Sequence, residues 1–136
     1  MRQQLQISRI EDMLQWLEVS SNDITGTQSV GFLVDHIGQL CNCLAFSNGQ
    51  MAIAKSELNK AKVNAYNTLI LSSHSQQKYF APSLAKDFVS AQCEKEQYCY
   101  DMAERASRTI THILDSLRTC VSALKEEIKI SSYQQI

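Results

Sequence analysis

The chain has 136 residues, enough for one domain built around a single core. It is 44% hydrophobic and 20% charged with a net charge of -1, which excludes both the charge-rich profile of a disordered chain and the basic profile of a dedicated nucleic-acid coat protein. Only one proline and four glycines interrupt it, so long helices are favoured over many short strands. We expect one all-α domain spanning residues 1–136.

The sequence indicates a cytoplasmic protein that holds no cofactor. No apolar run approaches the roughly 18 residues of a membrane span, and the N-terminus lacks the apolar core of a secretory signal. The cysteines are odd in number and form no C-x-x-C pair, which predicts reduced, mostly buried thiols and neither a disulfide framework nor a zinc knuckle. They are Cys41, Cys43, Cys93, Cys99 and Cys120.

A short helix is predicted over residues 9–19. Ser8 and Glu11 have the spacing of a capping box, which marks a helix start. Apolar residues then recur on one helical face until the polar stretch 20–23. A helix this short is marginal alone, so it must dock on something larger.

A long helix is predicted over residues 27–73. Its apolar and small residues alternate in steps of three and four, the rhythm of a coiled-coil seam, from Val30 to Thr68. The phase is the same on both sides of Asn48-Gly49, and a glycine inside a helix costs only about 1 kcal/mol relative to alanine. We therefore favour one continuous helix, with two helices broken at Asn48 as the alternative.

A second long helix is predicted over residues 83–129, after a turn at 74–82 that ends in Pro82, a residue suited to opening a helix. The same heptad rhythm runs from Val89 to Ile128. Two helices of similar length joined by a short turn predict a long antiparallel, coiled-coil-like hairpin. Small residues at the middle of the seam predict close helix approach there: Ser47, Ala54, Ala61, Ala103 and Ser107.

One hairpin and one small helix leave apolar surface uncovered, which predicts a homo-oligomer. We assign the large apolar seam residues to oligomerisation. They are Leu40, Leu44, Leu58, Ile110, Leu114, Leu117, Val121 and Leu124.

No motif in the sequence has the spacing of a catalytic site. There is no phosphate-binding glycine loop, no nucleophile elbow and no H-E-x-x-H, so we expect a non-enzymatic protein. Antiparallel pairing makes one metal site conceivable, from His36, Cys41 or Cys43, and Cys120, because imidazole and thiolate suit zinc. Interface histidines and core cysteines explain the same residues without a metal, and we prefer that explanation.

Charge is distributed unevenly along the chain. Residues 1–50 carry a net charge of -3, residues 51–86 carry five lysines against one glutamate for +4, and residues 87–136 carry -2. Aromatic residues, including Tyr66, lie in the basic stretch. Lysines that neutralise phosphate, interleaved with rings on which bases stack, are typical of a non-specific single-strand binder. The candidate residues are Lys55, Lys60, Lys62, Lys78, Tyr79 and Lys86. A solvated lysine face with ordinary turn aromatics is the alternative interpretation.

The layout of the chain includes the stretch at residues 55–71 and the segment at 110–127, ITHILDSLRTCVSALKEE. This layout resembles that of small helical proteins encoded by bacteriophages and prophages beside recombination genes. It is similar in size to the phage recombination mediator that loads a recombinase onto single-stranded DNA, over roughly residues 28–130. The resemblance is one of pattern and includes no diagnostic motif. It implies a ring-forming, DNA-binding accessory of recombination or replication that also contacts a recombinase or another protein. The alternative is a protein-only module, either a coiled-coil adaptor or a phage inhibitor of a host defence system.

Overall fold

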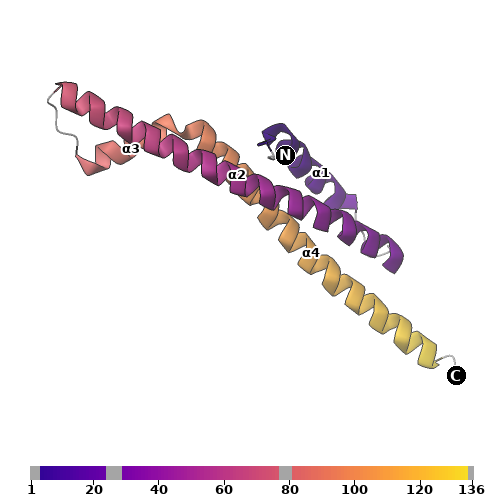
Figure 1. The fold of residues 1–136 in the computed structure, drawn as a ribbon. Coiled ribbons are helices and arrows are strands. Elements are labelled where there is room, and N and C mark those ends of the chain that lie inside the picture. Colours follow the sequence, from indigo (N-terminus) through magenta and orange to yellow (C-terminus); the bar gives the residue numbers. More distant parts are fainter. Residues whose placement is uncertain (1–3, 24–28, 77–80, 135–136) are drawn as a thin grey trace.

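The described part of the chain forms four helices, in the order α1 (Ile7–Asp23), α2 (Val30–Gln76), α3 (Pro82–Gln92) and α4 (Glu94–Gln134) (Figure 1). The computed structural model describes residues 4–23, 29–76 and 81–134, with the side chains of all these except 21–23 and 73–76. These ranges contain no strand, so the predicted all-α class is confirmed.

Helix α2 packs mainly against α4 and, further along, against α3. The chain returns antiparallel to α2, so residues further along α2 contact residues earlier in the segment formed by α3 and α4. Leu33 and Leu40 pack in one apolar cluster with residues 110–121, whereas Leu58 and Ala65 pack in a second cluster with Val89. Helix α4 continues past the start of α2, and its residues 125–134 are exposed (Figure 1).

Small residues line the crossing of α2 and α4, as the sequence predicted. Ser47 and Ser107 lie across from each other with their hydroxyl oxygens 2.8 Å apart, and Ala103 and Ala106 beside them are buried. Side chains this small let the two helix backbones approach closely. The two apolar clusters lie on either side of this crossing.

Helix α1 begins at Ile7 and extends four residues beyond the predicted end at Val19. The predicted capping box is wrong, because Ser8 lies inside the helix. The backbone carbonyl of Gln6 instead accepts hydrogen bonds from the N–H groups of Arg9 and Ile10, at 3.1 and 3.3 Å. The helix start is therefore set by how residues 4–6 are held, which is a tertiary effect.

Helix α1 docks mainly on α4 and buries Ile10 and Leu17. It also touches α2, where the Trp16 ring lies 5.7 Å from the His36 ring and the Arg9 guanidinium lies 4.5 Å from the centre of the Phe46 ring. The short helix thus finds the larger surface that its marginal length requires.

Helix α2 passes through Asn48-Gly49 without a break, which decides between the two alternatives left open by the sequence. Ser29 caps its start: the Ser29 hydroxyl oxygen accepts from the N–H of Phe32 at 3.1 Å. The helix extends three residues past the predicted end at Ser73.

The predicted single helix over residues 83–129 is wrong, because the chain bends at Cys93 and divides it into α3 and α4. The N–H of Cys93 bonds to the carbonyls of both Val89 and Ser90, and its φ and ψ of -108° and 17° leave the helical region. An uninterrupted seam would place Glu96 against α2, where burial of a carboxylate is costly. After the bend Cys99 is buried instead, and Glu96 lies partly exposed.

None of the helices in the described part of the chain combines the length and the apolar composition needed to cross a bilayer.

Candidate nucleic-acid interface

Two of the predicted lysines, Lys55 and Lys62, share one exposed side of α2. They are seven residues apart, which is close to two full turns at about 100° per residue. Asn59 and Tyr66 fall on the same side, and all four side chains are exposed. Tyr66 is 44% exposed. We call Lys55, Asn59, Lys62 and Tyr66 the Lys55 ridge.

Lys60 does not belong to this ridge. It lies about 140° around α2 from Lys55, on the side that carries Ile53 and Glu57. Lys86 is exposed on α3, a separate helix. Lys78 and Tyr79 lie outside the described residues. The predicted set is therefore divided among different surfaces, and only Lys55 and Lys62 are aligned on α2.

Folding brings acidic residues to the lysine-rich end. Packing of α3 and the start of α4 against α2 adds Asp87, Glu94 and Glu96 together with Lys95, so residues 51–96 carry +2 where residues 51–86 carry +4. Glu57 lies about 160° around α2 from Lys55. The Lys55 ridge is thus directed away from the only acidic residue of α2 in this region, and its two positive charges are not neutralised by Glu57.

Two cysteines are poor nucleophiles: Cys99, near this end, and Cys43, which lies in the other apolar cluster. Cys99 is buried, and its thiol pKa is raised above the ordinary value, first by burial and then by the negative charge of Glu57. Burial likewise raises the pKa of the Cys43 thiol. Both thiols stay protonated at neutral pH, whereas a cysteine nucleophile needs the thiolate.

The candidate metal site does not form. Among the residues that the structure describes, no group of three or more histidine, cysteine, aspartate or glutamate side chains is arranged to hold a metal ion. His36 is buried between aromatic rings, whereas Cys41 and Cys120 are exposed. The Nε2 atom of His36 has no hydrogen-bond partner among the described residues.

The residues assigned to oligomerisation pack inside the single chain. Six of them are buried and two are partly buried, so their apolar surface is already used within one subunit. The buried ones are Leu40, Leu58, Ile110, Leu114, Leu117 and Val121, and the partly buried ones are Leu44 and Leu124. Their assignment to contacts between subunits stays a prediction.

Sequence reasoning left Asn59 and Tyr66 out of the candidate site. The signal was present, because positions 55, 59, 62 and 66 follow the steps of four, three and four that keep residues on one helical face. Nearness in sequence groups all the lysines together, because it ignores the direction in which each side chain leaves the helix.

Comparisons with protein-family models, with characterised proteins and with solved structures found no match for this chain.

Proposed function

We propose that this protein is a non-enzymatic helical scaffold that binds single-stranded nucleic acid without sequence preference along the Lys55 ridge. One observation carries the proposal: Lys55 and Lys62 lie on one exposed side of α2, in line with Tyr66 and away from Glu57. The layout that resembles phage recombination proteins suggests a role as an accessory of DNA recombination or replication, in the cytoplasm and beside a recombinase or another protein partner.

The chemistry of the ridge suits an unpaired strand. Lys55 and Lys62 are separated by seven residues, or about 10 Å along the helix axis, and each ammonium group can neutralise one phosphate. Tyr66 lies one turn further along and offers a ring on which a base can stack, an interaction that is largely independent of sequence. Self-association, which we also propose, repeats the ridge on each subunit and raises the avidity for a long strand.

The test is a salt titration of the affinity for a labelled oligonucleotide, measured by fluorescence anisotropy. Each phosphate contact on a single strand contributes about -0.7 to the slope of log affinity against log salt. Lys55→Gln/Lys62→Gln should therefore make the slope shallower by about 1.4. Lys60→Gln is the matched control, since it removes the same kind of charge from the same helix on another side, and it should leave the slope nearly unchanged.

Tyr66→Ala should weaken binding by about 1 to 3 kcal/mol with little effect on the slope, because stacking is mostly uncharged. Two results would contradict the proposal. The first is the absence of oligonucleotide binding at low salt. The second is an equal change of the salt slope in Lys60→Gln and in either single ridge variant, Lys55→Gln or Lys62→Gln.

A protein-only interaction module is the second candidate, and a specific observation favours it. Several large apolar side chains near the same end are exposed and have no large apolar cover from the described part of the chain: Val63, Ile70, Leu71 and Leu84. This function takes first place if the wild-type protein binds no oligonucleotide.

A further inference from the structure

Residues 4–6 form a short non-helical segment that is fastened to α2 by one side chain, Gln50. Only 1% of the surface of this glutamine is exposed, which is uncommon for a side chain with a primary amide. Its Nε2 donates to the carbonyl of Gln4 at 2.9 Å, and its Oε1 accepts from the N–H of Gln6. A single side chain thus binds the backbone on both sides of Leu5.

The two hydrogen bonds of Gln50 imitate strand pairing. In a parallel sheet, one residue bonds through its N–H and C=O to the residues before and after its neighbour on the next strand. The Gln50 amide supplies the same donor and acceptor to the flanks of Leu5. This mode of recognition depends on backbone atoms and leaves the central side chain to be selected by its surroundings.

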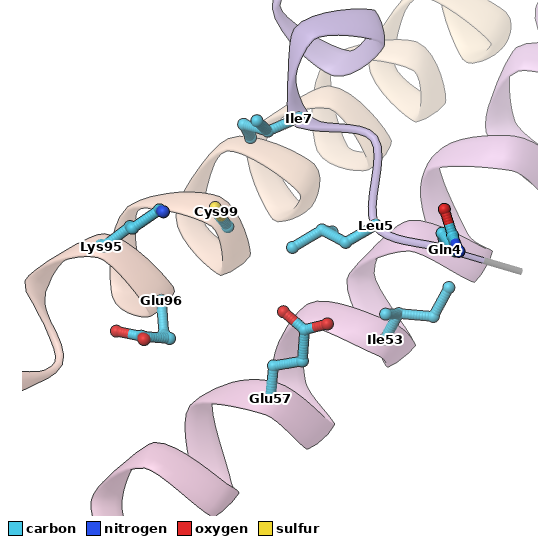
Figure 2. A pocket seen from close by; sticks show the side chains of 8 residues that line it. All are labelled: Gln4, Leu5, Ile7, Ile53, Glu57, Lys95, Glu96 and Cys99. Carbon is cyan, nitrogen blue, oxygen red and sulfur yellow. The ribbon is translucent and has the colours of Figure 1, made fainter.

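Those surroundings are a cavity between the segment, α2 and α4. Its volume is about 710 Å³, and its apolar lining includes Ile53 and Cys99 (Figure 2). Leu5 extends into this hollow. This volume is the space left open with Leu5 in place as one of the lining residues, and it lies in the range of small-ligand pockets, about 300 to 1,000 Å³.

The rim of the cavity is charged. Glu57 from α2 and Glu96 and Lys95 from α4 line it. None of the three forms an ion pair within the described part of the chain. Their net charge is negative, which favours a segment that carries a basic residue close to its apolar one.

We propose that this cavity is a docking site for a non-helical peptide segment of a partner protein, with a central apolar side chain larger than leucine and a basic residue nearby. Residues 4–6 of the chain occupy the site as an intramolecular competitor. Gln50 holds the backbone of either segment, the cavity accepts the central side chain, and Glu57 and Glu96 attract the basic residue. The site lies on a different side of α2 from the Lys55 ridge and does not depend on nucleic-acid binding.

The test uses two labelled peptides, one with the sequence of residues 1–8, MRQQLQIS, and one with the same sequence carrying Leu5→Phe. Their binding to the full chain is followed by fluorescence anisotropy. The Leu5→Phe peptide should bind several-fold more tightly than the unmodified one, because phenylalanine fills more of the cavity. The protein variant Leu5→Gly should bind both peptides about tenfold more tightly than the wild type, since its own segment competes less for the site.

Gln50→Leu tests the backbone contacts, and Gln39→Leu, at an exposed glutamine of the same helix, is the matched control. Gln50→Leu should weaken peptide binding at least tenfold, and Gln39→Leu should leave it unchanged. If Gln50→Leu fails to fold by circular dichroism, the exposed Glu57→Lys serves instead and should weaken binding several-fold. That loss should disappear with a peptide in which Arg2→Gln removes the basic residue.

Three results would overturn the proposal. The first is the absence of peptide binding by the Leu5→Gly protein at millimolar peptide. The second is equal peptide binding by Gln50→Leu and wild type. The third is a wild-type dimer, seen by sedimentation, that the unmodified peptide dissociates, because this would assign the site to residues 4–6 of a second copy.

Discussion

Alanine substitution at the buried serine pair should have unequal effects on the two sides. The Ser47 hydroxyl donates to the carbonyl of Leu44 at 3.2 Å, and a hydroxyl has only one proton to give. Ser107 must therefore be the donor in the 2.8 Å contact between the two hydroxyl oxygens. Ser47→Ala removes the acceptor of a buried donor, the Ser107 hydroxyl, whereas Ser107→Ala leaves the Ser47 proton bonded to the carbonyl of Leu44.

These roles set the expected magnitudes. An unsatisfied buried donor costs about 1 to 3 kcal/mol, and alanine recovers about 0.5 kcal/mol through its higher helix propensity. Ser47→Ala should thus lower the free energy of unfolding by about 1 to 2 kcal/mol. Ser107→Ala should change it by less than about 1 kcal/mol. The double variant should be more stable than Ser47→Ala alone, because no unpaired hydroxyl remains.

Urea unfolding followed by circular dichroism at one protein concentration measures all three variants. The denaturant slope should stay constant, which shows that the extent of unfolding is unchanged. Additive effects in the double variant, or a larger loss for Ser107→Ala than for Ser47→Ala, would refute the assigned donor and acceptor roles.

Two further predictions concern the thiols and the assembly. Burial raises the pKa of the Cys99 thiol above its ordinary value of 9.0, so above that pH the folded protein keeps a proton that the unfolded chain loses. The free energy of unfolding should therefore fall as pH rises above about 9. Cys99→Ser should reduce this fall in unfolding experiments across that range. Light scattering should give a mass well above that of the 15.4 kDa chain at micromolar concentration. We expect exposed apolar residues such as Val63, Ile70 and Ile128 to make the contacts between subunits. A monomer would contradict the proposed self-association.

The heptad pattern was sufficient to place most of the helical segments. Periodicity is a local property, and the steps of three and four from Val30 to Thr68 carried the phase correctly across Asn48-Gly49. Small residues on the seam likewise predicted the close crossing at Ser47 and Ser107. The lysine-rich stretch at residues 51–86 is likewise visible in the sequence as a cluster of like charge, and its role as a binding site stays a prediction.

The tertiary structure decided the bend at Cys93, the start of α1 and the grouping of charges. The bend depends on the cost of placing Glu96 against α2, which is known only once the partner helix is in position. The start of α1 depends on Gln50, 44 residues away from Gln6. Which lysines act together depends on the direction of each side chain around α2 and on the acids that α3 and α4 bring beside them. Each of these features depends on the free energy of contacts between distant segments, so a local pattern in the sequence does not predict it.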